Sequence, residues 1–167
     1  MPRTAFETAI GTCGLAWNDA GLTAFHLPGP RPARPDDPAM PLADAPAWIR
    51  ELAGRVQQHL AGALQDFRGV ALDTSAVSPF ARRVYEAARA VPAGQTRTYG
   101  DLAAALQEPR EASRAIGALL GANPWPLIVP CHRIVGANGR MTGFSAAGGV
   151  RTKVRLLALE GAQLIAE

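Results

Sequence analysis

The chain has 167 residues, of which 48% are hydrophobic and 19% are charged. This composition excludes a disordered or fibrous protein and allows an ordinary hydrophobic core. The net charge of +3 is unevenly distributed: residues 1–78 carry six arginines against eight acids, and residues 79–167 carry eleven basic residues against six acids. The basic second part favours a polyanionic partner such as nucleic acid. The alternative is that it simply reflects the arginine usage of a GC-rich genome.

The first 75 residues are expected to form an N-terminal α/β lobe. Three short strand-like segments (6–10, 13–17 and 22–27) come first, and Asn, Asp and Gly at 18–21 favour a hairpin turn. Residues 28–46 contain seven of the fourteen prolines, a density that predicts an exposed loop. Pro46 then opens a helix, because apolar residues recur after it at helical spacing: Ile49, Leu52, Ala53, Val56 and Leu60.

A second, mostly helical domain is expected over residues 78–167. Ser78 is a typical N-cap residue, and Pro79 follows it at the first helical position. The apolar face of this helix is predicted to consist of Phe80, Val84 and Val91. The complete chain is therefore predicted to be an α+β protein, with a small antiparallel sheet and a helix in the first part and mainly helices in the second.

Two short helices follow in this basic part of the chain. Residues 98–101 resemble a capping box and open a helix that runs through Leu106, and residues 111–121 form the next helix, which Asn123 and Pro124 terminate. Two short helices joined by a tight turn have the outline of a helix-turn-helix motif.

The second of these helices has one face of small residues. Arg114, Ala118 and Gly121 fall at positions i, i+4 and i+7, whereas Ile116, Leu119 and Leu120 point toward the expected core. A face of small residues headed by a guanidinium lets the helix backbone approach something large, or else packs tightly against another helix.

The candidate nucleophile is Cys131. Residues 127–129 are predicted to form a short buried strand that ends at Pro130, directly before Cys131 and His132. A neighbouring base or cation lowers the pKa of a thiol, and the thiolate is its reactive form. On these two residues alone, a buried structural thiol beside a core histidine is the more common interpretation.

The order of the motifs around Cys131 resembles the O6-alkylguanine-DNA alkyltransferases. The resemblance rests on Asn-Pro-Trp-Pro followed by Leu-Ile-Val-Pro-Cys-His-Arg-Ile-Val at 123–135, on the Gly-rich loop at 142–149 and on the helix at 153–161. Upstream, residues 98–103 and 113–117 resemble the helix-turn-helix of the same family. The match covers about residues 78–161, and the first 75 residues fit the variable N-terminal lobe of the family only in outline.

The resemblance implies a mechanism of direct reversal. Cys131 would attack the alkyl carbon on guanine O6 in a single irreversible displacement, and O4-alkylthymine would be a second substrate. His132 would remove the thiol proton through a water molecule, and Glu160 would fix the tautomer and orientation of His132. Tyr99 would donate toward guanine N3, and Asn123 would brace the turn before the active site.

The resemblance also implies how DNA is bound. The target nucleotide must leave the duplex, and Arg114 would fill the gap that it leaves in the stack. The small face of Ala115, Ala118 and Gly121 would enter the minor groove. A backbone amide near Ser145 would serve guanine O6. Further contacts are implied for four residues: Thr98, Arg133, Phe144 and Lys153. Phe144 stands where many members have tyrosine, so that ring stacking would survive without a hydroxyl contact.

Several other expectations follow from what the sequence lacks. The longest mostly apolar stretch, 115–129, is interrupted by asparagine and proline, and residues 1–11 lack the apolar core of a signal peptide. With two cysteines, we expect a reduced, cytoplasmic monomer without membrane contact. Cys13, His26 and His59 show no recognised zinc spacing, so neither a metal nor a cofactor is expected.

Two other functions are considered. An alkylation-responsive transcription factor would need an additional N-terminal domain with a cysteine cluster, and a cysteine hydrolase would need a preformed oxyanion hole. The sequence shows no such cysteine cluster, and the basic second half and Arg114 argue against the hydrolase, so the repair protein is expected.

Overall fold

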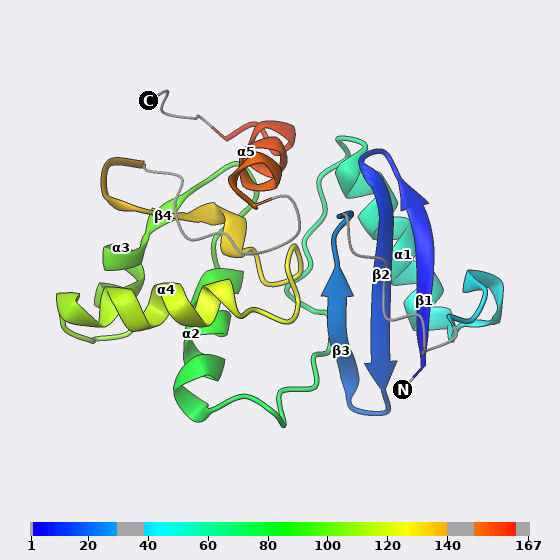
Figure 1. Cartoon of the computed structure of the whole chain (residues 1–167), viewed down its shortest axis with the longest axis horizontal. Coiled ribbons are helices and arrows are strands. Elements are labelled where there is room, and N and C mark those ends of the chain that lie inside the picture. Colours follow the sequence, from blue (N-terminus) through cyan, green and yellow to red (C-terminus); the bar gives the residue numbers. More distant parts are fainter. Residues whose placement is uncertain (1, 30–38, 140–148, 163–167) are drawn as a thin grey trace.

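The computed structural model describes residues 2–29, 39–139 and 149–162. A three-stranded sheet with helix α1 lies on one side of the molecule, and helices α2–α5 lie on the other (Figure 1). We refer to β1–β3, α1 and the segment that follows α1 up to Ser78 as the sheet half, and to α2–α5 with their connections as the helical half. The structure thereby confirms the predicted α+β fold, and the division into two domains stays a prediction.

The sheet consists of β1 (Arg3–Thr8), β2 (Gly11–Asn18) and β3 (Gly21–His26), which pair antiparallel in chain order. The predicted hairpin turn joins β2 to β3, and Asn18 Oδ1 accepts from the amides of Ala20 at 2.8 Å and Gly21 at 3.2 Å. Gly21 is required here, because its φ is +144° and a Cβ atom would lie 2.6 Å from the carbonyl oxygen of Ala71.

Helix α1 (Ala47–Leu60) packs against the sheet, as Figure 1 shows, and it begins after Pro46 as predicted. All of the apolar residues that predicted it are buried, together with His59. A short 3₁₀ turn (Leu42–Asp44) precedes it, and Met40 bridges to Thr4 at the edge of the sheet. Part of the proline-rich segment, residues 30–38, lies outside the described residues.

The helical half begins with α2 (Pro79–Arg89), and Ser78 Oγ accepts from the Ala81 amide at 3.1 Å as its N-cap. Its buried face differs from the predicted one: Phe80 is only half-buried, and Val91 follows the helix. The face instead consists of Ala81, Val84, Tyr85 and Ala88. Alanines contribute to this buried face although they give a weak hydrophobic signal in the sequence.

The remaining elements of the helical half are short. They are β4 (Arg97–Thr98), α3 (Tyr99–Ala105), a 3₁₀ turn (Arg110–Ala112), α4 (Ser113–Gly121), a 3₁₀ turn (Cys131–Arg133), β5 (Ile134–Val135), a 3₁₀ turn (Ala137–Gly139) and α5 (Gly149–Leu159). Strands β4 and β5 pair in parallel. The predicted capping box at the start of α3 is present with both of its hydrogen bonds, between Thr98 and Asp101.

The prediction of a strand at 127–129 is wrong, because this segment is a buried turn. Leu127 has a φ of +77°, and the Val129 amide donates to the Trp125 carbonyl at 2.8 Å. The side chain of Asn123 closes the turn, since its Nδ2 donates to the Val129 carbonyl and its Oδ1 accepts from the Trp125 amide, both at 2.9 Å. An apolar run between two prolines does not distinguish a strand from such a turn.

Direct hydrogen bonds join the two halves. Trp125 Nε1 donates to the Leu22 carbonyl at 2.8 Å, and the Phe25 amide donates to the Pro124 carbonyl at 2.9 Å. Arg89 Nη2 of α2 donates to the carbonyl oxygens of Phe67 and Val70 at 2.8 and 2.9 Å. In the described parts of the chain, every helix is too short or too polar to cross a membrane.

Candidate active site

Cys131 begins the 3₁₀ turn that follows the Asn123 turn, and its side chain is buried, with 6% of its surface exposed. Burial raises the pKa of the Cys131 thiol. Three features act in the opposite direction: a hydrogen bond with the Asn123 side chain, the positive charge of Lys153, and the backbone N–H groups of Cys131 and His132. The surroundings therefore disfavour a bare thiolate by desolvation but supply several groups that stabilise one.

His132, the next residue, is completely buried, and its Nε2 lies 2.8 Å from Glu160 Oε1. Since an ionised carboxylate only accepts hydrogen bonds, Nε2 carries the hydrogen and Nδ1 keeps a lone pair. Burial lowers the pKa of His132, and Glu160 opposes this shift. Within the described residues His132 Nδ1 has no hydrogen-bond partner. The ring is thus a neutral base with an unused acceptor nitrogen.

Glu160 lies at the C-terminal cap of α5, and Gly161 ends the helix there with a φ of +75°. The Gly161 amide donates to the Ala158 carbonyl at 3.0 Å and the Ala162 amide to the Leu157 carbonyl at 2.9 Å, which is the hydrogen-bond pattern of a Schellman motif. The sequence Glu-Gly therefore fixes where the carboxylate leaves the helix.

Three side chains surround the Glu160 carboxylate. Oε1 accepts from His132 Nε2 at 2.8 Å and from Arg133 Nε at 2.9 Å, and Oε2 accepts from Arg133 Nη2 at 2.7 Å and from His59 Nε2 at 2.8 Å. Burial alone would raise the pKa of Glu160, but the hydrogen bonds from His132, His59 and Arg133 outweigh it and lower that pKa well below its usual range. We call these four residues the Glu160 cluster.

Two residues that the resemblance implied for DNA binding are buried instead. Arg133 is 6% exposed, and besides its two bonds to Glu160 its Nη1 donates to the Val91 carbonyl at 2.8 Å. Lys153 is fully buried, and its Nζ donates to the Ile134 carbonyl at 2.6 Å. Neither cation faces the surface, so the prediction that they contact DNA is corrected: Arg133 balances the charge of Glu160, and Lys153 lies near Cys131.

Tyr99 and Lys153 meet beside the nucleophile. Lys153 Nζ lies 5.9 Å from the centre of the Tyr99 ring. Burial lowers the pKa of Lys153 to about 8, and the Cys131 thiolate opposes that shift. Tyr99 also packs against α4, where a Cβ atom on Gly117 would lie 3.7 Å from the ring, an ordinary van der Waals contact.

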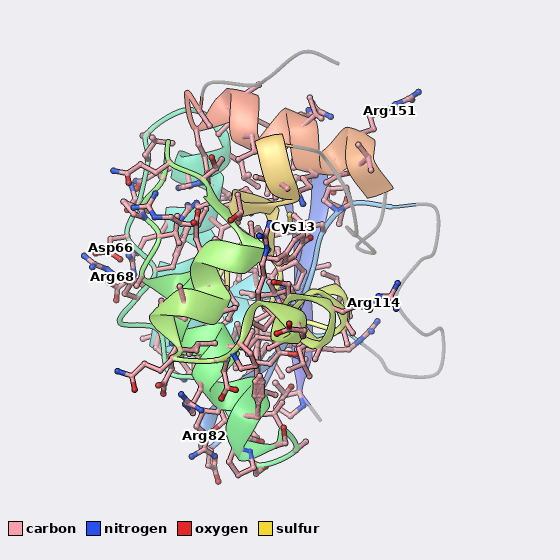
Figure 2. The ribbon with its side chains drawn as sticks, turned by 90° about the vertical axis from the view of Figure 1, so that its left-hand side faces the viewer. Cys13, Asp66, Arg68, Arg82, Arg114 and Arg151 are labelled. Carbon is pink, nitrogen blue, oxygen red and sulfur yellow. The ribbon has the colours of Figure 1, made fainter. Side chains whose placement is uncertain are left out.

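The small face of α4 is directed to solvent. Arg114, Ala115 and Ala118 are exposed and Gly121 is half-buried, whereas Ile116 and Leu120 are buried. Figure 2 shows Arg114 pointing away from the body of the molecule. The alternative, that this face packs against another helix of the same chain, is wrong for Arg114, Ala115 and Ala118.

The other residues implied for DNA binding have different positions. Thr98 is half-buried and caps α3. Phe144 and Ser145 lie outside the described residues, so that the contacts implied for them stay predictions.

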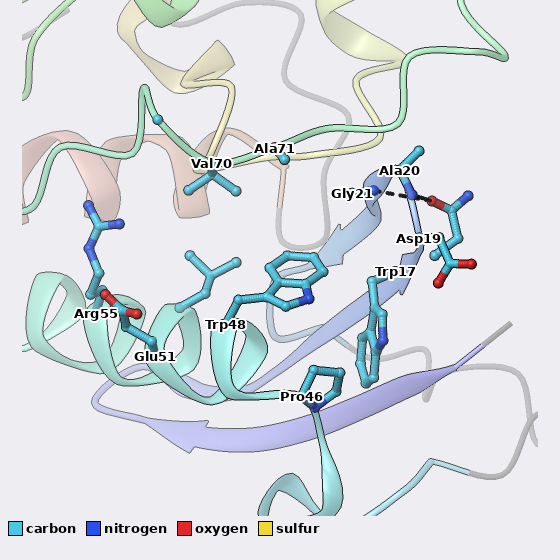
Figure 3. A pocket seen from close by; sticks show the side chains of 13 residues that line it. Trp17, Asp19, Ala20, Gly21, Pro46, Trp48, Glu51, Arg55, Val70 and Ala71 are labelled. Atoms are coloured by element: carbon cyan, nitrogen blue, oxygen red, sulfur yellow. Dashed lines mark hydrogen bonds between the residues drawn. The ribbon is translucent and has the colours of Figure 1, made fainter.

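One hollow, of about 570 Å³, lies away from the site in the sheet half, where Trp17 and Trp48 face Val70 and Ala71 (Figure 3). None of the residues around Cys131 lines it. Across the described residues, no group of three or more histidine, cysteine, aspartate and glutamate side chains is arranged to hold a metal.

Sequence reasoning missed His59 and the true role of Arg133. His59 is separated from Glu160 by 101 residues, and no local pattern links the two. The resemblance implied a DNA contact for Arg133, whereas its side chain binds Glu160. One signal in the sequence did point to partners for Glu160. The helix dipole disfavours a carboxylate at the C-terminus of a helix, so Glu160 needs cationic or hydrogen-bond donor partners there.

Comparison with known proteins agrees with this geometry. Residues 79–162 match the family model described as 6-O-methylguanine DNA methyltransferase, DNA binding domain. The methylated-DNA–protein-cysteine methyltransferase of Methanosarcina acetivorans is 36% identical over 96% of this chain and 99% of its own length. That of Salmonella typhimurium is 52% identical over 88 residues, which is 53% of this chain, and the chain spans only 50% of that relative's length.

A solved structure extends the comparison to almost the whole chain. The structure described as Mycobacterium tuberculosis OGT in complex with DNA superimposes with a TM-score of 0.78 at 33% identity, covering 96% of this chain and 93% of that one. The near-complete match to the Methanosarcina relative and the family model over half of the chain lead to one conclusion: the chain belongs to the methylated-DNA–protein-cysteine methyltransferase family.

Proposed function

We propose that this protein repairs DNA by transferring an alkyl group from guanine O6 irreversibly to Cys131. The observation that carries the proposal is the hydrogen bond between His132 Nε2 and Glu160 Oε1, which leaves His132 Nδ1 unbonded. His132 directly follows Cys131, whose thiol is buried. The Cys131 thiolate attacks the alkyl carbon, a carbon–sulfur bond forms, and the bond from that carbon to O6 breaks. The product is a thioether, and no step regenerates the thiol.

The protons move through the neighbouring residues. A water molecule between the thiol and His132 Nδ1 would carry the proton of Cys131 to the ring, and Glu160 stabilises the imidazolium that forms. The leaving guanine anion needs a proton, and Tyr99 is the proposed donor toward N3. Asn123 supports the thiolate through its side chain and holds the turn before it. A backbone amide near Ser145 is proposed for O6.

The proposed substrate is double-stranded DNA, and the structure of the Mycobacterium tuberculosis relative is described as a complex with DNA. The exposed face of Ala115, Ala118 and Gly121 would enter the minor groove, where small residues allow close approach. Arg114 would occupy the space of the flipped nucleotide. We further propose that the protein acts as a cytoplasmic monomer and accepts O4-alkylthymine as a second substrate.

The decisive experiment incubates the protein with a duplex that carries O6-methylguanine with a radiolabelled methyl group. We expect label to move to the protein up to one equivalent, and peptide mapping by mass spectrometry to find it on Cys131. Repeated turnover would indicate a hydrolase, and binding without transfer would indicate a sensor of damage; either result contradicts the proposal.

Replacing Arg114 by alanine should slow repair of a paired duplex by about 10- to 100-fold and affect a single-stranded substrate much less. Extruding a nucleotide from a stacked duplex costs a few kcal/mol, and a single strand has no stack to refill. The measurement is the single-turnover rate on both substrates. Arg82→Ala is the matched control, because Arg82 is an exposed arginine of α2 that lies away from Arg114 in Figure 2. Equal losses on both substrates would reduce Arg114 to a phosphate contact.

Replacing Lys153 by methionine should slow transfer by about tenfold at pH 7, since one pKa unit of the thiol corresponds to about 1.4 kcal/mol. The charge of Lys153 lowers the pKa of Cys131, and burial lowers the pKa of Lys153 itself to about 8. Lys153 is protonated below that pH, so wild type and variant should converge as the pH rises through 8. Single-turnover rates between pH 6.5 and 9.5 test this, and a constant ratio over that range would show that Lys153 does not act through its charge.

A further inference from the structure

The Glu160 cluster contains one residue that the proposed mechanism does not use. His59 comes from α1, in the sheet half, and its Nε2 lies 2.8 Å from Glu160 Oε2 with both side chains fully buried. The other three members, His132, Arg133 and Glu160 itself, belong to the helical half. A side chain from the first sixty residues therefore touches the carboxylate that orients the base.

The tautomer of His59 follows from its second contact. The backbone amide of Gln65 donates to His59 Nδ1 at 2.9 Å, so this nitrogen is an acceptor with a lone pair. The ring hydrogen is then on Nε2, which donates to Glu160 Oε2.

The ring of His59 is also held from the side. The Phe67 ring packs against it with the ring centres 5.2 Å apart and a tilt of 54°, and the guanidinium of Arg55 covers Phe67. Residues 65 and 67 thus fix both the tautomer and the direction of the ring. A group fixed in this way is a preorganised hydrogen-bond donor for one oxygen of Glu160.

This donor completes the hydrogen bonding of the carboxylate. Each oxygen of Glu160 accepts two hydrogen bonds, and Arg133 bonds to both oxygens. His132 and His59 supply the remaining two, one to each oxygen. Without His59, Oε2 would lose one of its two donors, and the carboxylate would have freedom to rotate about the arginine and change its angle to His132.

The charge of the cluster changes during the proposed reaction. Glu160 and Arg133 cancel each other in the resting protein, and the cluster gains one positive charge when His132 takes the proton of Cys131. The carboxylate must therefore keep its orientation toward His132, and the His59 donor holds its other oxygen.

We propose that His59 is a positioning residue for alkyl transfer, through which the sheet half holds Glu160 against His132. The proposal rests on the proposed function of Cys131 and His132. It makes the first part of the chain a contributor to the reactivity of the thiol, acting through Glu160 and without touching the substrate.

Three replacements of His59 in the full-length protein separate positioning from packing. Gln places an amide N–H near the position of Nε2, so His59→Gln keeps the donor to Glu160. Asn reaches only as far as Nδ1, so His59→Asn keeps an acceptor for Gln65 and loses the contact with Glu160. His59→Leu loses both. Arg89→Ala is the control for docking of the halves, since it removes the bonds to Phe67 and Val70 without touching Glu160.

Three readouts are the single-turnover transfer rate from O6-methylguanine duplex, the affinity for that duplex in a gel shift, and the melting temperature. The fourth is the pH profile of Cys131 alkylation by iodoacetamide. It is measured in a Cys13→Ala background, which removes the other thiol. We expect His59→Asn and His59→Leu to transfer about 10- to 100-fold more slowly, as a part of a general-base contribution. Their iodoacetamide profiles should shift to higher pH with unchanged DNA affinity. His59→Gln should stay within about threefold of wild type, and Arg89→Ala should lower the melting temperature alone.

Wild-type rates in His59→Asn, or a loss in His59→Gln as large as in His59→Leu, would overturn the proposal. So would an iodoacetamide profile of His59→Asn or His59→Leu that stays at the wild-type position. If wild type transfers no alkyl group, the proposed function fails, and the iodoacetamide profiles still decide whether His59 acts on the thiol through the cluster.

Discussion

Replacing Cys131 by serine should abolish alkyl transfer, with a loss of at least about 10,000-fold, as removal of an activated nucleophile produces in other enzymes. A thiol ionises near neutral pH when a base and a cation assist it, whereas an alcohol at the same place stays protonated. His132, Lys153 and Asn123 all act on the sulfur and would have no thiolate to support. Because serine is slightly smaller than cysteine and α4 is unchanged, the affinity for alkylated duplex should stay within about twofold of that of wild type.

The control for this variant is the second cysteine. Cys13 lies in β2, is 1% exposed, and has its pKa raised to about 11, mainly by burial. It therefore remains a thiol at neutral pH, and Cys13→Ala should still accept one alkyl equivalent at the wild-type rate. The measurement is label bound per protein after a single-turnover incubation. Appreciable transfer to Cys131→Ser would show that another residue accepts the alkyl group.

Replacing Glu160 by glutamine should both slow transfer by about 100-fold and destabilise the fold by about 3–5 kcal/mol. The second effect arises because Arg133 would become a buried charge without a counterion. An amide presents one N–H₂ group and one oxygen, so at least one of the donors from His59, His132 and Arg133 would face another donor. The loss of charge also removes the group that stabilises a protonated His132.

Two measurements test this prediction, single-turnover transfer well below the melting temperature and denaturant unfolding across pH. The folded-state pKa of Glu160 is lowered, so its contribution to the free energy of unfolding is present above about pH 4.3, the usual value for glutamate, and is lost as the pH falls toward the folded pKa. The glutamine variant should lack this acid-dependent loss. The control is Glu108→Gln, which should behave as wild type because Glu108 pairs with Arg83 in a partly exposed position. An unchanged unfolding midpoint in Glu160→Gln would refute the argument from the buried pair of Glu160 and Arg133.

The parts of the fold that the sequence predicts well depend on neighbouring residues. The capping box at Thr98 and Asp101 and the helix after Pro46 each follow from spacing over one or two turns of chain. The antiparallel strands likewise follow from alternation and a turn containing asparagine and glycine. Such signals are local, and the structure contains them within a few residues of the predicted boundaries.

What could not be predicted depends on contacts between distant segments. Arg133 and Lys153 are basic residues beside a proposed DNA site, and only their surroundings show that they are buried against Glu160 and Ile134. The segment at 127–129 is as apolar as a strand, and only the side chain of Asn123 shows it to be a turn. His59 joins the site across 101 residues, a separation at which the sequence carries no pattern.

The position of Glu160 in the chain has a consequence for newly made protein. Synthesis proceeds from the N-terminus, so Cys131 and His132 leave the ribosome before the carboxylate that lies 28 residues beyond His132. The contact with His59 spans 101 residues, and contacts between such distant segments form late because closing a long loop is entropically unfavourable. Until the final helix docks, Glu160 does not reach His132 or His59. The site that we propose as a single-use alkyl acceptor is therefore complete only when the last helix of the chain has folded.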